Sequence, residues 1–433
     1  MTAMQGIAPP TGDLGRLQLF FLAAAVFVVS AGYGALLPVL PAMISQQMPY
    51  PDSVILARHV GYLSGVYTAG VMIGALAWGY LSDYLGRPRT LIAGLTAYVA
   101  SMLLLLLPSI GGLYTIYLLR FAAGVAVAAV VPMVPALVAA HTPKALRARR
   151  FAWLGAASLL GFLLGPGLNA AADALAGLVL DSDALPTLSA RIVILLAAFL
   201  GAFIMIGLAW NLPLAGGASE TAPEDAGTDS PPSLAALVSL NVAVMFALSG
   251  FELGIVLQGQ QHTDLSTQGV ALMFAECSLV MLVINALLFF TSMLDRVSPR
   301  VLLIAGVLIG MSGLAILALH QSVQWMFIGV SLTSAGTGLM LPVISFLAAG
   351  ASPARLGATM SWLAVASGMG QTLGSAIGGW IFSGPGQSGF GWLILALLLA
   401  LLLSLTVSSW GRPSRGNARP TTWGSFPPQR PER

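Results

Sequence analysis

Long apolar runs, separated by short polar stretches, dominate the pattern of this chain. A helix needs about 20 mostly apolar residues to cross the hydrocarbon core of a membrane. On that basis we predict an all-α membrane protein with twelve spanning helices and with both termini on one side. The predicted spans are residues 17–40, 59–81, 91–109, 113–139, 151–172, 191–212, 234–258, 269–293, 301–319, 324–348, 358–382 and 389–410.

A polar stretch in the middle of the chain divides six spans from six. It is rich in Gly, Ala, Ser and Pro and carries acidic but no basic residues, which is typical of a flexible linker. We predict an N-terminal six-helix bundle over residues 1–212, a cytoplasmic linker over 213–233, a C-terminal six-helix bundle over 234–410 and a basic cytoplasmic tail over 411–433.

The two predicted bundles resemble each other in sequence around their fourth and fifth helices. Matches among Ala, Leu and Gly arise easily by chance in such a chain, but Pro and Trp matches in register are harder to dismiss. Both copies begin on the same side of the membrane, which indicates parallel repeats related by a pseudo-twofold axis along the membrane normal. The pairs are Pro132 with Pro342, Pro143 with Pro353 and, after a slip of one residue, Trp153 with Trp362.

Composition and charge place the chain in a membrane. Only 8% of its residues are charged and 57% are hydrophobic, whereas soluble proteins carry about 25% charged residues. Of its 18 Lys and Arg residues, fifteen fall on predicted loops that share a side with the termini and two on the opposite side. The positive-inside rule then predicts a multi-pass protein of the cell membrane with both termini in the cytoplasm. The single Lys beside seventeen Arg, with the Ala and Gly content, indicates a bacterial source and therefore the inner membrane.

The stretch "GYLSDYLGRPR", residues 79–89, places several charges directly after an apolar run. We expect Gly79 to let another helix approach closely and Gly86 to permit a tight turn. Asp83, Arg87 and Arg89 are expected to form a charged cluster with a neighbouring helix end. Such a cluster would hold one arrangement of the helices and break in another.

This stretch resembles the signature Gly-x-Leu-x-Asp-x-x-Gly-Arg-x-Arg of the major facilitator superfamily of secondary transporters. Residues 120–128 resemble its Arg-containing helix-4 motif, and residues 161–170 the helix-5 motif of its 12-helix drug/proton antiporter branch. Gly161, Gly165 and Pro166 fit the helix-5 motif, while Asn169 and Ala170 replace its final glycines. The resemblance implies the twelve-helix fold of that superfamily. The helix-5 glycines either pack helices together or seal the substrate cavity that the resemblance implies between the two bundles.

Three ionisable residues lie inside predicted spans, where a charge is expensive and is by default a functional hypothesis. Arg120 is a fixed positive charge that needs a partner, whereas Glu252 and Glu276 are candidate proton carriers. The resemblance implies that helices 1, 4, 7 and 10 line the cavity, which favours Glu252 for the proton pathway and a structural or peripheral role for Glu276. A static link between helices stays open for both glutamates.

Three further residues are candidates for contact with a substrate. Tyr33 in the first span and Phe251 and Gln258 in the seventh lie on helices that the resemblance assigns to the cavity. Packing in the interior is the alternative for each of them.

These observations predict a secondary active transporter that moves a small organic, lipophilic solute by alternating access, with proton-coupled efflux as the favoured mode. Proton-symport uptake and an uncoupled facilitator are the alternatives, and an integral-membrane enzyme is a remote one. We predict no catalytic residue, no metal site and no cofactor, with the proton gradient as the energy source. The expected partners are a small-molecule substrate, protons and the lipid bilayer, without nucleic acid, and the chain is expected to be monomeric.

Overall fold

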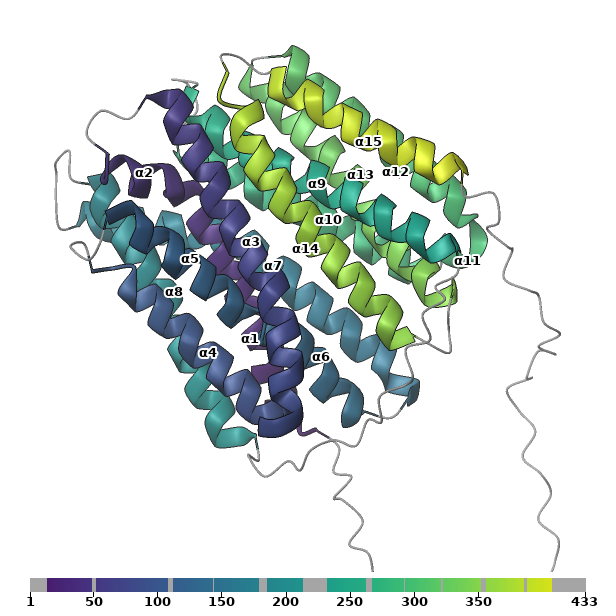
Figure 1. Ribbon diagram of the computed structural model, residues 1–433, viewed down its shortest axis with the longest axis horizontal. Coiled ribbons are helices and arrows are strands. Elements are labelled where there is room, and N and C mark those ends of the chain that lie inside the picture. Colours follow the sequence, from purple (N-terminus) through teal and green to yellow (C-terminus); the bar gives the residue numbers. More distant parts are fainter. Residues whose placement is uncertain are drawn as a thin grey trace, which may run out of the picture.

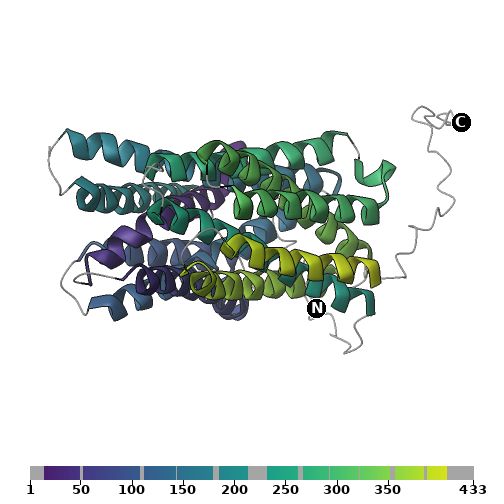
Figure 2. The same ribbon diagram turned by 90° about the horizontal axis from the view of Figure 1, so that it is seen from above.

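The structure is a computed structural model that describes residues 14–48, 52–107, 112–142, 144–178, 185–212, 232–261, 267–291, 293–320, 322–351, 356–384 and 388–406. Every regular element within these ranges is a helix, and the helices run side by side (Figure 2). They are α1 (Arg16–Leu36), η1 (Leu37–Val39), α2 (Leu40–Ser45), α3 (Ser53–Leu85), α4 (Arg87–Leu104), α5 (Gly112–Val127), α6 (Val130–Ala140), α7 (Lys144–Gly177), α8 (Leu185–Asn211), α9 (Pro232–Gln261), α10 (Thr267–Phe290), α11 (Met293–Arg296), α12 (Pro299–Leu319), α13 (Val323–Ala351), α14 (Leu356–Ile381) and α15 (Ser388–Thr406).

The helices form two halves, as predicted. With α1, η1 and α2 as one passage, α5 and α6 as another and the short α11 left out, the described residues form twelve helical passages. Nine of these are long and apolar enough to cross a membrane, and Gly389–Leu405 is a shorter apolar helix. The N-terminal half comprises α1 to α8 and the C-terminal half α9 to α15 (Figure 1). The all-α membrane fold is therefore confirmed.

Two of the predicted spans are interrupted at prolines. The first becomes α1, η1 and α2, with Pro38 and Pro41 near the two junctions. The fourth splits into α5 and α6 just before Pro132, which has no N–H to donate to the carbonyl of Ala128. The spans at 17–40 and 113–139 are therefore each more than one helix.

Gly86 makes the tight connection that the sequence indicates. It is the residue between α3 and α4, with φ of 80°, a value that side-chain-bearing residues rarely adopt. Its N–H donates to the carbonyl of Ser82 at 2.9 Å, which closes the last turn of α3.

In each half, the backbone of one helix packs directly against the backbone of another at a glycine. A Cβ at Gly161 of α7 would lie 2.2 Å from the carbonyl oxygen of Phe27 in α1. Gly370 of α14 follows Gly161 at the same sequence offset that relates Trp362 to Trp153. A Cβ at Gly370 would lie 2.6 Å from the carbonyl oxygen of Val242 in α9. The sequence repeat therefore corresponds to the same backbone contact in both halves.

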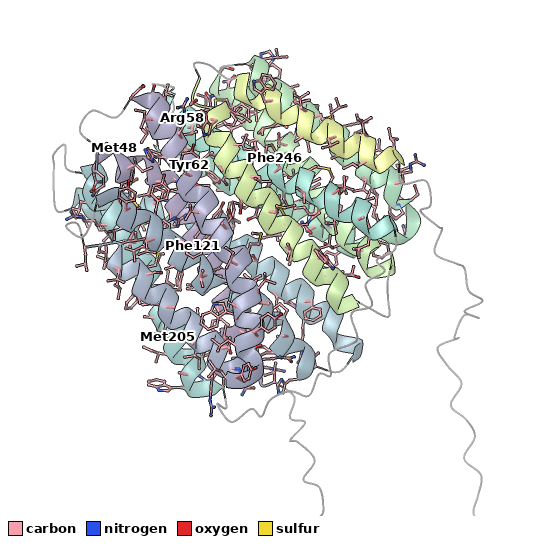
Figure 3. The ribbon with its side chains drawn as sticks, in the orientation of Figure 1. Met48, Arg58, Tyr62, Phe121, Met205 and Phe246 are labelled. Carbon is pink, nitrogen blue, oxygen red and sulfur yellow. The ribbon has the colours of Figure 1, made fainter. Side chains whose placement is uncertain are left out.

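The two halves meet along α3 and α14. A Cβ at Gly61 would lie 2.7 Å from the Cα of Gly379, so these backbones are in direct contact. Trp380 donates from Nε1 to the hydroxyl of Tyr62 at 2.5 Å, and the guanidinium of Arg58 lies 3.8 Å from the Trp380 ring centre. Figure 3 labels Arg58 and Tyr62 near the start of α3. We call this set of five residues the latch.

The halves separate toward the other end of the same helices. Figure 1 shows α3 and α14 together at their upper ends and apart at their lower ends. The contact continues to Met72, against which Gly368 packs, but a Cβ at Gly79 would meet nothing within 4 Å. The expectation that a helix packs closely on Gly79 is therefore not met in this arrangement, because α14 diverges before it reaches that level.

Most of the predicted linker and the whole predicted tail, residues 213–231 and 411–433, lie outside the described residues. The assigned domain boundaries there stay predictions.

The glycine contact between α1 and α7 generates a test of the fold. We expect Gly161→Ala to lower the free energy of unfolding by about 1–3 kcal/mol, because the new methyl group overpacks against the α1 backbone. Gly155→Ala is the matched control in the same helix, since a Cβ there meets nothing within 4 Å. Thermal unfolding in detergent compares the two, and equal stability of both variants would contradict the packing.

Candidate functional site

Arg120 lies inside the N-terminal half, where the sequence analysis places a buried charge. Its side chain is 1% exposed, and its guanidinium carbon lies 4.5 Å from the centre of the Tyr67 ring on α3. Nε and Nη1 have no hydrogen-bond partner among the described residues. Tyr67, Tyr33 and Tyr98 all lie close enough to interact electrostatically with the charge. The contact that the structure gives this cation is therefore the face of the Tyr67 ring.

Glu252 joins the two halves of the molecule. The hydroxyl of Tyr33 on α1 donates to Oε2 of Glu252 on α9 at 3.3 Å. The Tyr33 ring also stacks on Tyr67, with ring centres 5.4 Å apart. Arg120, Tyr67, Tyr33 and Glu252 therefore form a continuous chain of contacts from the N-terminal into the C-terminal half. We call these four residues the tyrosine relay.

A row of aromatic rings leaves the relay at Tyr33. Phe162 on α7 stacks on Tyr33 with ring centres 5.7 Å apart, and it meets Phe274 of α10 edge-on at 6.0 Å. This second contact between the halves is apolar. The side chains around Glu252 thus combine aromatic surfaces with few polar groups, which is the lining that lipophilic ligands favour.

Glu276 has a different environment from Glu252. Its Oε1 accepts a hydrogen bond from the hydroxyl of Ser331 on α13, and its Oε2 is buried without a partner among the described residues. Both groups belong to the C-terminal half, so this hydrogen bond does not cross between the halves. The role of Glu276, whether structural, peripheral or in the proton pathway, stays a prediction.

Phe251 and Gln258 lie in the interior of the protein. Phe251 is 0% and Gln258 1% exposed, so neither faces an open cavity in this arrangement. Both polar atoms of the Gln258 side chain lack a hydrogen-bond partner among the described residues. Of the three predicted substrate contacts, only Tyr33 belongs to the relay.

The residues of the 79–89 stretch lie at the end of α3 where the halves are apart. Arg87 donates from Nη1 to the carbonyl of Ala136 on α6 at 3.4 Å, which ties this loop to the fourth helical passage. Arg89 is exposed. The side chain of Asp83 lies outside the part that the structure describes, so the predicted charged cluster stays a prediction.

The helix-5 glycines pack α7 on α1. A Cβ at Gly165 would lie 2.8 Å from the carbonyl oxygen of Ala31, and the side chain of Asn169 donates to the carbonyl of Ala35 at 3.0 Å. The backbone of Pro166 belongs to α7, while its side chain lies outside the described part. Helix packing is therefore the role that these contacts support.

Sequence reasoning missed the tyrosines that surround Arg120. Tyr67 and Tyr98 come from α3 and α4, and no motif marks either of them. A Cβ at Gly32 would lie 1.9 Å from the Tyr98 hydroxyl, so the glycine beside Tyr33 makes room for this side chain. The buried cation itself is the signal that could have found them, because cations bind the faces of aromatic rings.

The arrangement can hold a proton and transmit its presence between the halves. The Glu252 carboxylate accepts a charge-assisted hydrogen bond from the Tyr33 hydroxyl, and this bond weakens when the carboxyl becomes neutral.

Among the described residues no group of three or more His, Cys, Asp or Glu side chains could hold a metal ion.

Two related bundles of apolar helices are an architecture that secondary transporters use. The sequence matches the Major Facilitator Superfamily over residues 22–288 and 234–430, and the chain belongs to this family. The protein is accordingly a multi-pass membrane protein of this transporter family and not an enzyme.

Relatives with a known role match part of the chain. The quinolone resistance protein NorA of Staphylococcus aureus is 28% identical over 153 residues, which are 35% of this chain and 37% of NorA. The class B tetracycline resistance protein of Escherichia coli is 33% identical over 135 residues, 31% of this chain and 32% of the relative. The matches thus span about a third of each relative.

Solved structures share the fold over nearly the whole chain. The human organic anion transporter MFSD10 has a TM-score of 0.63 at 19% identity and covers 92% of this chain and 100% of its own. The xylose transporter XylE from E. coli, in a partially occluded inward-open conformation, has a TM-score of 0.68 at 14% identity and covers 92% and 99%. At these identities the likeness concerns the fold alone.

The hydrogen bond between Tyr33 and Glu252 yields a prediction. We expect Tyr33→Phe to lower the free energy of unfolding by about 1.5–3 kcal/mol near neutral pH, because it leaves a buried carboxylate without its donor. Tyr98→Phe is the matched control, since the Tyr98 hydroxyl is buried without a partner. The loss in Tyr33→Phe should shrink in acid, where Glu252 is neutral. Thermal unfolding at two pH values measures this, and a loss independent of pH would contradict it.

Proposed function

We propose that this protein exports a lipophilic organic solute across the cell membrane in exchange for protons, by alternating access between its two halves. The proton gradient supplies the energy, and Glu252 carries the proton. Both termini lie in the cytoplasm, and one chain is sufficient for transport.

The observation that carries this proposal is the hydrogen bond from Tyr33 to Glu252. It joins a titratable group on α9 to α1, so it spans the two bodies that must move relative to each other. A change in protonation at that place acts directly on the contact between the halves. Glu276 has no such position, because its partner Ser331 belongs to its own half.

Proton binding would act on this contact through charge. The ionised Glu252 carboxylate holds the Tyr33 hydroxyl with a charge-assisted hydrogen bond, which is roughly twice as strong as a neutral one. Protonation removes the charge and weakens the link between α1 and α9. The fixed charge of Arg120 lies against Tyr67, which stacks on Tyr33, and it remains in place when the proton binds.

The direction and the substrate class rest on three supports. The partial helix-5 motif resembles that of drug/proton antiporters. The relatives NorA and the class B tetracycline protein are resistance proteins, and a transporter confers resistance when it removes a compound from the cell. The aromatic row of Tyr33, Phe162 and Phe274 provides apolar surface for a lipophilic solute.

With the predicted orientation, the structure corresponds to the cytoplasm-facing form. The latch end of α3 and α14, which is opposite the start of α1, is then the external end and is closed. The other end, where Gly79 faces open space, would admit a solute from the cytoplasm.

A single pair of variants tests the coupling. We expect Glu252→Gln to abolish proton-coupled transport while the protein remains folded, because the glutamine amide does not bind and release a proton. Glu276→Gln is the matched control and should retain coupled transport. The measurement is lumenal pH in inverted membrane vesicles with an imposed acid-inside gradient, to which cationic, neutral and anionic organic compounds are added in turn.

The results have distinct meanings. Alkalinisation of the lumen by a compound in wild type and in Glu276→Gln, but not in Glu252→Gln, supports export by proton exchange through Glu252. Unchanged alkalinisation in Glu252→Gln would remove this residue from the mechanism. Silence of folded wild-type protein toward the whole panel would contradict export of such compounds.

A further inference from the structure

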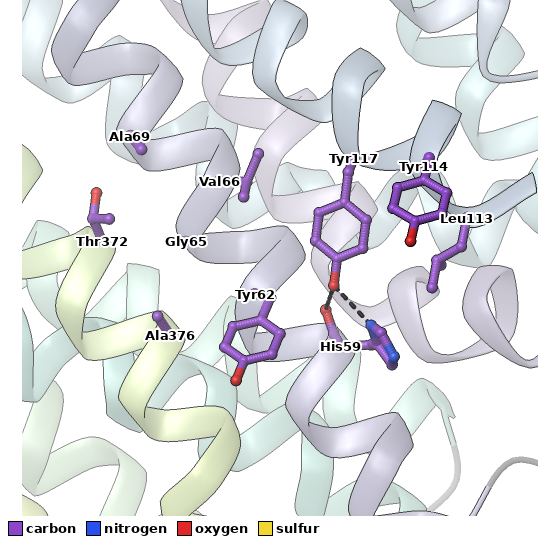
Figure 4. A pocket seen from close by; sticks show the side chains of 10 residues that line it. All are labelled: His59, Tyr62, Gly65, Val66, Ala69, Leu113, Tyr114, Tyr117, Thr372 and Ala376. Carbon is purple, nitrogen blue, oxygen red and sulfur yellow. Dashed lines mark hydrogen bonds between the residues drawn. The ribbon is translucent and has the colours of Figure 1, made fainter.

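A crevice at the latch end of the molecule is not used by the transport mechanism. It has a volume of about 460 Å³ and is formed by α3, α5 and α14. Gly65, Val66 and Ala69 of α3 line it between Tyr117 of α5 on one side and Thr372 of α14 on the other (Figure 4). The crevice therefore combines side chains from both halves.

The surroundings of the crevice face lipid. On the α5 side Tyr114 is 89% and Leu118 66% exposed, and on the α14 side Ile377 is 43% and Trp380 52% exposed. Exposed apolar side chains within the spans of a membrane transporter form the surface that acyl chains cover. A molecule that occupies the crevice is consequently in contact with the bilayer.

One end of the crevice is polar. Nδ1 of His59 lies 2.8 Å from the hydroxyl of Tyr117, as the dashed line in Figure 4 shows. Tyr62 lines the same end. Arg58 lies beside this end rather than in its lining: its guanidinium packs on the Trp380 ring, and its Nε is buried without a hydrogen-bond partner among the described residues. Tyr, Trp and Arg side chains at one level are typical of the membrane–water interface.

The crevice extends from this polar end into the membrane. His59 is the seventh residue of α3, so it lies roughly 9 Å from the start of the helix at 1.5 Å per residue. Ala69 is ten residues further along α3, or about 15 Å deeper. A narrow apolar crevice along the membrane normal, with a cation and hydroxyls at its interfacial end, has the shape and polarity of one phospholipid chain below its phosphate.

We propose that the crevice binds a membrane phospholipid, with an acyl chain along Gly65, Val66 and Ala69 and the phosphate near His59 and Arg58. Because its walls come from α3 and α5 of one half and α14 of the other, the site exists only while the latch is closed. A ligand that binds one of two forms raises the population of that form. The bound lipid thus stabilises the form in which the latch is closed.

Photolabelling of the full chain tests this site. The protein is placed in nanodiscs of phosphatidylethanolamine and phosphatidylglycerol that contain a trace of phosphatidylethanolamine with a diazirine on its acyl chain. We expect labelled peptides to concentrate on residues 62–69 and 114–117, relative to the exposed face of α12. Labelling of all lipid-facing helices to the same extent would overturn the proposal.

A variant that fills the crevice sharpens the test. Val66→Phe should lower labelling of these peptides about tenfold, because the larger ring takes the space of the acyl chain. Val301→Phe introduces the same change at a position on α12 that is 55% exposed and should leave the labelling unchanged. If Val66→Phe does not fold, Ala69→Leu fills the same part of the crevice with a smaller change.

Two results would overturn the lipid assignment. Labelling that persists at the wild-type level in folded Val66→Phe would show that the lipid does not occupy the crevice. Displacement of the label by compounds of the cationic, neutral and anionic panel would make the crevice an access route for the solute instead. Labelling of these peptides that is unchanged by the compounds and is lost in Val66→Phe is the result that the proposal expects.

Discussion

A carboxylate inside the membrane must find its partner within the protein, because lipid offers none. Glu252 finds that partner in the opposite half, where the Tyr33 hydroxyl donates to it. Tyr33 is in turn held by stacking between Tyr67 and Phe162, and Tyr67 lies against the buried charge of Arg120. The polar interior is therefore organised around one link whose strength depends on a proton.

This link can act on the whole molecule only if each half moves as a unit. Gly161 places α7 directly on α1, and Gly370 places α14 directly on α9. Close backbone packing through small residues is how membrane helices associate without a hydrophobic driving force between them. The halves contact each other along α3 and α14, from the latch to the packing of Gly368 on Met72, and Thr68 and Thr372 share a hydrogen bond of 3.1 Å there. Nearer the relay they meet through the Phe162–Phe274 ring pair and the Glu252 link.

The sequence predicted what depends on local composition. Apolar runs placed the helical passages, Gly86 marked the turn that its positive φ requires, and the Pro and Trp repeat indicated two related halves. The split before Pro132 was missed because this proline lies inside an apolar run that satisfies the length rule. Tyr67 and the latch were missed because they depend on which helices of different halves come together. The open space at Gly79 depends on how the halves are arranged, which a motif does not specify.

The central claim is that protonation of Glu252 changes how the halves sit against each other. Spin labels at positions 84 and 362, which are exposed on α3 and α14 where these helices diverge, report the distance between the halves by pulsed electron paramagnetic resonance. The account predicts that the distance distribution of wild type shifts between pH 8 and pH 5. Glu252→Gln should give one distribution at both values. An equal shift in wild type and in Glu252→Gln would contradict the account.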